Sequence, residues 1–231
     1  MALQFENLIL QQGAFELRAD LEVPVHSFTA VIGPSGAGKS TLFDAISGFL
    51  RPASGTVKWQ GKDLNSLPPG KRPVAMLFQD NNLFPHLTVG QNVGLALSQK
   101  ARLTPEQENA VNNVLTRVGL EGTASRRPSQ LSGGQISRAA LARLLLQDRP
   151  LWLLDEPFSA LGPALKSEML ELVREIATEK KATVLMITHD PADARNFAPT
   201  SILVTDGRAT GPFETIGLLD NPPASLAEYL G

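Results

Sequence analysis

The segment that most constrains the fold is a glycine-rich stretch close to the N-terminus. Residues Gly33 to Ser40 read Gly-Pro-Ser-Gly-Ala-Gly-Lys-Ser and fit the pattern Gly-x-x-x-x-Gly-Lys-[Ser/Thr]. The β-branched run Phe28–Ile32 predicts a buried strand before it, and Leu42–Gly48 predicts a helix after it. This order predicts a phosphate cradle, because glycines let backbone amides converge and a helix start carries partial positive charge.

Two side chains in the same stretch supply further chemistry. Lys39 adds a full positive charge to the cradle, and the Ser40 hydroxyl is a ligand for a Mg²⁺ that bridges phosphates. A glycine-rich turn that matches the pattern by chance is the alternative, but the correct flanking elements argue against it. We therefore expect the chain to bind a nucleoside triphosphate.

Composition limits the other classes of function. The 231 residues suffice for one large core, and 42% hydrophobic with 19% charged residues is ordinary for a globular protein. A net charge of −2 gives no electrostatic case for nucleic acid, and the absence of cysteine excludes disulfides and thiolate metal sites. With neither a signal-peptide pattern nor a long apolar run, we expect a cytosolic chain that a partner holds at any membrane.

The remaining strand patterns predict an α/β fold. Phe15–Val23 alternates apolar and charged residues, which predicts a half-buried strand paired antiparallel with Leu3–Ile9 across a turn at Gln11–Gly13. A helix is predicted over Pro163–Lys180 and a short terminal one over Pro222–Leu230. Further strands are predicted at Thr56–Gln60, Val74–Phe78, Leu151–Asp155, Thr183–Ile187 and Ser201–Val204.

Strand patterns are absent from Asp80 to about Gln147. Thr104 and Gln107 form a capping-box pattern with proline between them, which predicts a helix that ends near Gly119. A second helix is predicted from Ser132 to Leu145. The expected organisation is one domain over 1–231, a P-loop NTPase core with an N-terminal antiparallel β part and a helical subdomain inserted at about 80–147.

Two adjacent carboxylates follow the buried run Leu151–Leu154. We expect Asp155 to bind Mg²⁺, directly or through water, and Glu156 to polarise the attacking water. A strand-end carboxylate pair in a solvated loop is the alternative, which is less favourable beside a P-loop.

A second glycine-rich turn, Leu131–Gln135, opens the predicted helix at Ser132. The Ser132 hydroxyl and the amides of Gly133 and Gly134 are expected to form another anion site. The alternative is an ordinary N-cap followed by a turn. Two phosphate cradles but only one lysine-bearing loop favour a composite site shared by two copies of the chain.

Two polar residues follow other predicted strands. Gln79 can reach a metal or the attacking water through its amide carbonyl, and His189 can contact a γ-phosphate or orient water. Their alternatives are a polar strand end and a structural histidine. No role is assigned to His26 or His86.

These elements together resemble the ATP-binding subunit of ABC transporters, over essentially the whole chain. The resemblance implies ATP and Mg²⁺ as cofactors, and a head-to-tail homodimer that energises transmembrane permease subunits. In that family Gly33–Ser40 corresponds to the Walker A segment and Leu131–Gln135 to the signature sequence, and each ATP lies between the Walker A segment of one subunit and the signature sequence of the other. The resemblance makes Glu156, His189 and Gln79 catalytic, and Ser40, Gln79 and Asp155 metal ligands. It assigns nucleotide contacts to Gly33, Pro34, Ser35, Gly36, Ala37, Gly38, Lys39, Ser40, Thr41, Ser132, Gly133, Gly134 and Gln135.

One branch of that family, the ATPases of bacterial thiamine importers, is the most similar. Its pattern is found at Gly48–Gly55, at Arg72–Phe84 with the pair Asn81 and Asn82, and at His86–Val89. The last two segments are expected to receive a coupling helix of the permease. This branch implies a periplasmic thiamine-binding protein and a place on the cytoplasmic face of the inner membrane. The alternative transported solute is ferric iron or another small solute. The alternative classes of protein are a soluble ATPase that acts on nucleic acid or ribosomes, and a P-loop kinase or GTPase.

The chain departs from the family pattern at three places. Gly162 stands where an aspartate is usual, which is expected to alter communication across the dimer and the start of the next helix. Ile136 follows the signature where a polar residue is usual. Gln11 and Gln12 stand near the usual adenine-stacking aromatic, and Tyr229 is far along the chain, so Phe15 is either an adenine contact or plain core packing.

Overall fold

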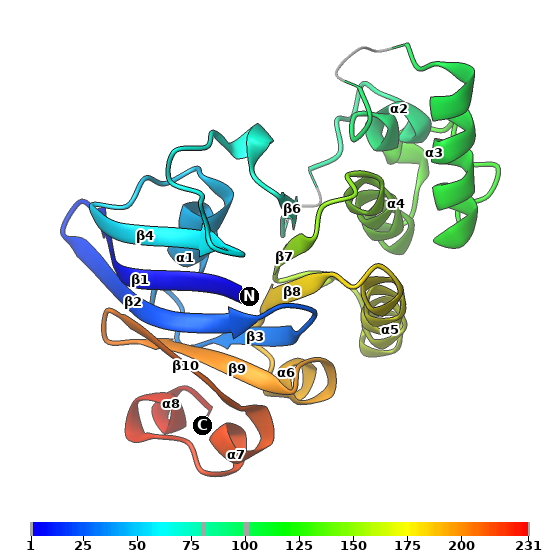
Figure 1. Ribbon diagram of the computed structural model, residues 1–231. Coiled ribbons are helices and arrows are strands. Elements are labelled where there is room, and N and C mark those ends of the chain that lie inside the picture. Colours follow the sequence, from blue (N-terminus) through cyan, green and yellow to red (C-terminus); the bar gives the residue numbers. More distant parts are fainter. Residues whose placement is uncertain (1, 80–81, 99–101, 231) are drawn as a thin grey trace. The chain divides into compact units, whose positions relative to one another are not determined.

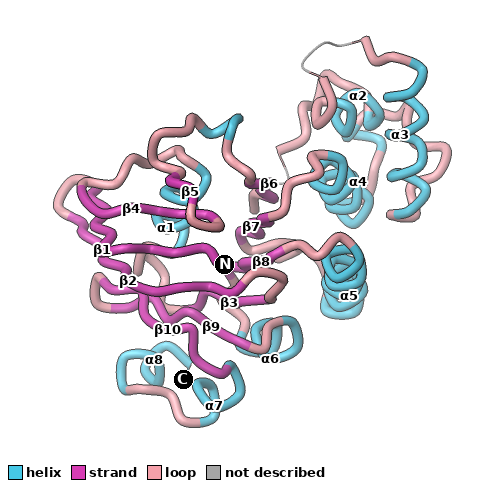
Figure 2. Tube along the Cα trace, in the orientation of Figure 1, coloured by secondary structure: helices cyan, strands magenta, loops and turns pink. Residues whose placement is uncertain are grey.

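The computed structural model describes residues 2–79, 82–98 and 102–230. The chain divides into two compact units, each taken by itself below. The sheet unit comprises Met1–Met76, Pro150–Glu156 and Ala177–Gly231. The helical unit comprises Leu77–Arg149 and Pro157–Ile176. Figure 2 shows that strands dominate the first unit and helices the second.

One sheet organises the strands, in the order β5-β4-β1-β2-β10-β9-β3-β8-β7-β6 (Figure 1). β1 pairs antiparallel with β2 and β4, whereas β3 pairs parallel with β8 and β9, and β7 parallel with β8. The predicted α/β class is thus confirmed. The strands are β1 Ala2–Gln12, β2 Phe15–Pro24, β3 Phe28–Ile32, β4 Ser54–Trp59, β5 Lys62–Asp63, β6 Val74–Leu77, β7 Leu151–Asp155, β8 Thr183–Ile187, β9 Thr200–Thr205 and β10 Arg208–Glu214.

The antiparallel pair of β1 and β2 is confirmed, but its predicted turn is wrong. Gln11 and Gln12 still belong to β1, since they pair with Glu16 and Phe15, and the chain turns at Gly13 and Ala14. Of the five apolar positions that alternate along β2, Leu17, Ala19 and Val23 are buried, whereas Phe15 and Leu21 are partly buried.

The parallel strands β3, β7 and β8 have the predicted bounds. Every residue of β8 is buried, and in β7 only the last, Asp155, is partly exposed. Such continuous apolar runs are typical of parallel strands covered on both faces. Because parallel strands end at the same edge, the residues that follow β3, β7 and β8 are brought close together.

Helix α1, Lys39–Ser47, follows β3 and packs on the sheet. Its residues Leu42, Phe43, Ala45 and Ile46 are fully buried and belong to one core cluster with strands β1, β2 and β4. The predicted stop at Gly48 is confirmed, because this residue is left-handed (φ 91°) and its amide donates to the Asp44 carbonyl.

Three further helices lie in the sheet unit: α6 Pro191–Phe197, α7 Thr215–Asp220 and α8 Ala224–Leu230. The side chains of Asp190 and Glu214 cap α6 and α7, respectively. The sequence analysis predicted α8, with a start two residues too early, and missed α6 and α7. A one-turn 3₁₀ helix over Pro69–Lys71 precedes β6.

The helical unit contains α2 Val89–Gly94, α3 Pro105–Arg117, α4 Gly133–Leu146 and a 3₁₀ turn over Pro128–Gln130. Most of α5, Pro163–Glu179, also lies there. The capping box at Thr104 is confirmed: its hydroxyl accepts from the Gln107 amide, and the Gln107 side chain accepts from the Thr104 amide. Helix α2 was not predicted, although Thr88 and Gln91 form the same capping box.

Candidate functional site

The loop after β3 has a backbone that only glycine accommodates readily. Gly33 and Gly38 have φ angles of 148° and 103°. A Cβ on Gly33 would lie 1.9 Å from the Val204 carbonyl oxygen, and one on Gly38 would lie 2.6 Å from Cζ of Phe15. The loop is therefore fixed in shape by β9 behind it and by β2 beside it.

The start of α1 leaves backbone donors available. Gly38 caps the helix with no side-chain hydrogen bond. Within the described residues, the amides of Gly36, Gly38, Lys39 and Ser40 have no protein acceptor. Unpaired amides at a helix N-terminus, together with the helix dipole, make an anion site.

Lys39 lies over this loop and is 8% exposed. Its Nζ donates to the carbonyls of Gly33 at 2.8 Å and Pro34 at 2.9 Å. Burial lowers the pKa of Lys39, and the negative charges of Glu156 and Asp155 oppose that change. The ammonium group is thus held at the mouth of the cradle, between the loop and the two carboxylates.

Asp155, the last residue of β7, meets Ser40 from α1. The Ser40 hydroxyl lies beside the Asp155 carboxylate and favours its charged form. Burial raises the pKa of Asp155, and the charges of Glu156 and Asp44 add to the rise. No cluster of three or more His, Asp or Glu side chains in the described ranges is arranged to hold a metal. One carboxylate and one hydroxyl fit Mg²⁺, which keeps waters and takes its remaining ligands from substrate phosphates.

Glu156 and His189 are brought together although they follow different strands. His189 Nδ1 lies 3.1 Å from Glu156 Oε2, and the Glu156 amide donates to the Ile187 carbonyl at 3.0 Å. Glu156 is left-handed (φ 45°), a conformation that costs free energy for a residue with a side chain. The sheet unit therefore collects Lys39, Ser40, Asp155, Glu156 and His189 at one edge.

The second glycine-rich turn lies in the helical unit and closes on itself. Ser132 Oγ accepts from the Gln135 amide at 3.3 Å, and Gln135 Oε1 accepts from the Ser132 amide at 3.0 Å. A serine hydroxyl that accepts one hydrogen bond still has its own proton to donate. The N-cap alternative is thus how this turn is built, and it leaves one donor for an external anion.

Helix α4 is fixed against α5 just after this turn. A Cβ on Gly134 would lie 2.6 Å from Cδ2 of Leu165, so the two helices approach closely there. Arg138 forms an ion pair with Glu168 and donates to the Val118 carbonyl at 3.1 Å. The signature turn and the start of α5 therefore belong to one packed body.

Gln79 lies in the helical unit, is exposed, and follows β6 after one intervening residue. Asp80 and Asn81, part of the segment expected to face a permease, lie outside the described residues. The backbone carbonyl of Asn82, the next described residue, accepts a hydrogen bond from Arg143 at 2.7 Å. Phe84 is 47% exposed.

Phe15 packs partly buried against the core with its ring beside Gly38. Its place next to the phosphate loop is compatible with a contact to adenine as well as with plain core packing. The Tyr229 side chain lies outside the described residues.

Two residues near the site were missed by the sequence analysis. Asp44 is one helical turn after Ser40, and burial raises its pKa. The i, i+4 spacing from Ser40 was the available signal. Arg72 is buried at the opposite end of α1; it begins the family pattern Arg72–Phe84, but that pattern gave it no role of its own.

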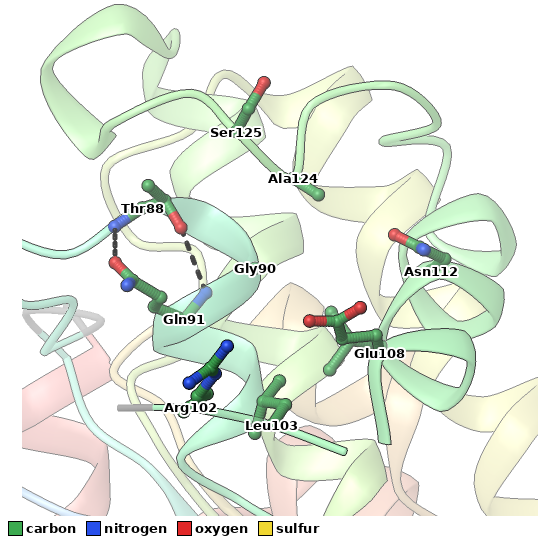
Figure 3. A pocket seen from close by; sticks show the side chains of 10 residues that line it. Thr88, Gly90, Gln91, Arg102, Leu103, Glu108, Asn112, Ala124 and Ser125 are labelled. Carbon is green, nitrogen blue, oxygen red and sulfur yellow. Dashed lines mark hydrogen bonds between the residues drawn. The ribbon is translucent and has the colours of Figure 1, made fainter. Parts of the chain in front are cut away.

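A pocket of about 370 Å³ lies within the helical unit, between α2, α3 and the loop at Ala124 (Figure 3). The capping box of Thr88 and Gln91 forms one wall, and Glu108 and Asn112 of α3 point into it. Its lining is mostly polar, with Leu103, Val111 and Ala124 as the apolar part.

The loop after β3, with its available amides and Lys39, forms a binding site for a chain of phosphates. Proteins with this loop between a strand and a helix form the P-loop class, which binds nucleoside triphosphates. A profile of the ABC transporter family matches residues 18–159. The chain belongs to the ABC transporter family, as the resemblance predicted. Among described residues, no helix has the length and apolar character needed to cross a membrane.

Relatives agree over nearly the whole chain. The thiamine import ATP-binding protein ThiQ of Cereibacter sphaeroides is 57% identical over 99% of both chains. ThiQ of Ruegeria is 54% identical over 99% of both, and ThiQ of Salmonella paratyphi A is 48% identical over 93% of this chain and 91% of its own. A solved dimeric ATP-binding cassette in a post-hydrolysis state with ADP and phosphate is 29% identical, with a TM-score of 0.78 over 92% of this chain and 98% of that one.

Proposed function

We propose that this chain is the ATP-hydrolysing subunit of an importer and that its transported solute is thiamine. The observation that carries this proposal is the agreement, along nearly the full length, with relatives named as thiamine import ATP-binding proteins. The alternative, ferric iron or another small solute, retains the same ATPase chemistry, since the solute is bound by other subunits.

The sheet unit is proposed to hold Mg·ATP by its phosphates. The loop amides and Lys39 bind the phosphate oxygens, while Ser40 and Asp155 would hold Mg²⁺, with Gln79 as a further candidate ligand. The bound ion supplies charge neutralisation on the phosphates. The desolvated Asp155 supports this assignment, because a buried carboxylate without a full counter-charge suits a cation.

Glu156 is proposed as the general base. A water oxygen attacks the γ-phosphorus, the bond to the bridging oxygen breaks, and Glu156 takes the proton from that water. His189, 3.1 Å from Glu156 Oε2, holds the carboxylate in position. General-base assistance of this kind is worth about 10²–10⁴-fold in rate.

The helical unit is proposed to act as the inserted subdomain that presents the signature turn to a second copy of the chain. The Ser132 hydroxyl and the amides of Gly133 and Gly134 then donate to the γ-phosphate held by the partner copy. The similar ATP-binding cassette of known structure is a dimer, which supports a homodimer for this chain.

We further propose that this chain lies at the cytoplasmic face of the inner membrane, where its helical unit docks on a transmembrane permease. The exposed ring of Phe84 supports this surface. The pocket between α2 and α3 (Figure 3) is a second feature of the same unit that a partner segment could enter. A periplasmic thiamine-binding protein would act through the permease.

Replacing Glu156 by Gln tests the proposed chemistry. The variant keeps the size of the side chain, so it is expected to bind ATP as the wild type does and to lose at least about 100-fold in turnover. Glu121→Gln, an exposed carboxylate in the helical unit, is the matched control and is expected to turn over normally. Unchanged hydrolysis in Glu156→Gln would remove the general-base assignment.

A further inference from the structure

Two buried cations lie at opposite ends of α1. Among the described residues, Lys39 and Arg72 are the only charged side chains that are less than 9% exposed, at 8% and 2%. Lys39 belongs to the phosphate loop at the N-terminal end of the helix. Arg72 has no place in the proposed catalytic scheme, and burying a guanidinium is costly unless it makes full use of its donors.

The Arg72 guanidinium donates three hydrogen bonds to backbone carbonyls. One nitrogen, Nη1, donates to the Ala45 carbonyl at 2.6 Å and the Ile46 carbonyl at 2.9 Å, and Nε donates to Leu67 at 2.9 Å. Burial lowers the pKa of Arg72, and Asp63 opposes that change. A single planar group therefore joins the end of α1 to the segment that follows β5.

These bonds complete the C-terminus of α1. The last carbonyls of a helix have no partner within it. Here the amides of Gly48 and Leu50 donate to the Asp44 carbonyl, and the Arg72 side chain donates to the next two carbonyls along the helix, those of Ala45 and Ile46. A Cβ on Gly48 would lie 2.6 Å from Arg72 Nε, so glycine at this position makes the space for the guanidinium. Its positive charge also suits the negative end of the helix dipole.

The residue after Arg72 ties the same point to the strand that carries Asp155. The Pro73 carbonyl accepts from the amide of Leu151, the first residue of β7, at 3.2 Å. Helix α1 carries Ser40 and strand β7 carries Asp155, and these two side chains lie beside each other at the other end, where α1 contacts β7. Helix and strand are thus anchored at one point behind the site and meet again within it.

We propose that Arg72 is a positioning residue that sets the alignment of Ser40 with Asp155, and through it the affinity of the site for metal-bound nucleotide. This inference rests on the proposed function. Arg72 contacts no reacting atom; it acts on the tilt of α1 relative to β7.

The test measures the dissociation constant of a non-hydrolysable ATP analogue with Mg²⁺ and without it, by calorimetry. Only the metal uses Ser40 and Asp155 together, so the ratio of the two constants reports their alignment. Arg72→Lys keeps the charge but cannot reach Leu67 and the end of α1 at once. We expect this variant to lose about 10-fold of the Mg²⁺ enhancement, the low end of the loss seen when a group that supports a metal ligand is removed. Its metal-free constant should stay within about twofold of the wild type, because that constant does not depend on Ser40 and Asp155 together.

Ser47→Ala is the matched control, because the Ser47 hydroxyl donates to the Phe43 carbonyl at the same end of α1 without joining it to another segment. It is expected to lower the Tm and leave the Mg²⁺ enhancement unchanged. Arg72→Met is expected to lose more of the enhancement than Arg72→Lys does. A folded Arg72→Lys with wild-type Mg²⁺ enhancement overturns the inference, whereas a wild type that binds no nucleotide overturns the proposed function itself.

Discussion

The two glycine-rich turns of this chain look alike in sequence and differ in how they are built. In the loop at Gly33–Ser40 the glycines are left-handed and the helix start has no side-chain cap, so its amides are available to a ligand. In the turn at Ser132 neither glycine has a positive φ, and Ser132 and Gln135 cap the helix reciprocally. The first turn is shaped for an anion, and the second is a stable helix start with one proton to spare.

Charge differs between the two turns as well. The loop at Gly33–Ser40 has a buried ammonium and two carboxylates around it, whereas the residues of the signature turn carry no charge. A site that needs both turns therefore receives its electrostatics from one and its final hydrogen bonds from the other. Substitutions in either turn can therefore test which contribution that turn makes.

The largest expected effect comes from removing the spare proton of the signature turn. Ser132→Ala loses both the cap and the hydroxyl donor, so we expect about 1 kcal/mol less stability and about a 10²-fold lower kcat. Thr104→Ala is the matched control, since α3 has the same capping box. It is expected to lose similar stability and no activity. Equal kcat in the two variants would reduce Ser132 to a helix cap.

The second prediction concerns charge in the other turn. Burial raises the pKa of Asp155 above the unfolded value of about 3.9. The folded state therefore holds the proton more tightly, and its stability falls as pH rises through the interval between the two pKa values. Without nucleotide and metal, Asp155→Asn is expected to have a higher Tm than the wild type at pH 7.5.

The difference in Tm between Asp155→Asn and the wild type should shrink as the pH falls through the raised pKa of Asp155 towards the unfolded value of about 3.9, because the wild-type carboxyl becomes neutral over that interval. Differential scanning fluorimetry across this range measures it. A lower Tm for Asp155→Asn at neutral pH would show that neighbouring groups already compensate the negative charge of Asp155, so that no bound cation is needed to stabilise it.

The smallest effect is expected at Gly162, before the start of α5. A Cβ there meets nothing within 4 Å, its φ is not positive, and its carbonyl accepts the first α5 hydrogen bond, from Lys166 at 3.0 Å. Gly162→Asp is therefore expected to fold and to change stability by only a few tenths of a kcal/mol. Urea titration checks this, and a failure to fold would mean that the backbone requires glycine.

Much of the fold was predictable because burial leaves a plain pattern. The apolar runs of β3, β7 and β8 gave their bounds directly, since strands covered on both faces consist mainly of apolar and β-branched residues. Helices α2, α6 and α7 were missed because six or seven residues contain too few turns for a periodic pattern. The capping residues at Thr88, Asp190 and Glu214 were the remaining signal.

The candidate site was only partly predictable. Motifs pointed to Lys39, Asp155 and Glu156, and topology brings these residues to one edge of the sheet. The capping bond between Ser132 and Gln135 follows a known pattern, which the sequence analysis weighed only as an alternative. Arg72 was beyond reach, because its role depends on carbonyls of residues more than twenty positions away.

The central claim, that each ATP is held by the Gly33–Ser40 loop of one copy and the Ser132 turn of the other, is tested most directly with doubly tagged mixed dimers. One dimer carries Lys39→Ala and Ser132→Arg on the same subunit, and a second carries them on different subunits. If sites are shared, the second dimer retains one intact site and is expected to trap one ATP analogue, while the first traps none. Trapping by the first dimer alone would contradict the account, because it would place both turns of a site in a single chain.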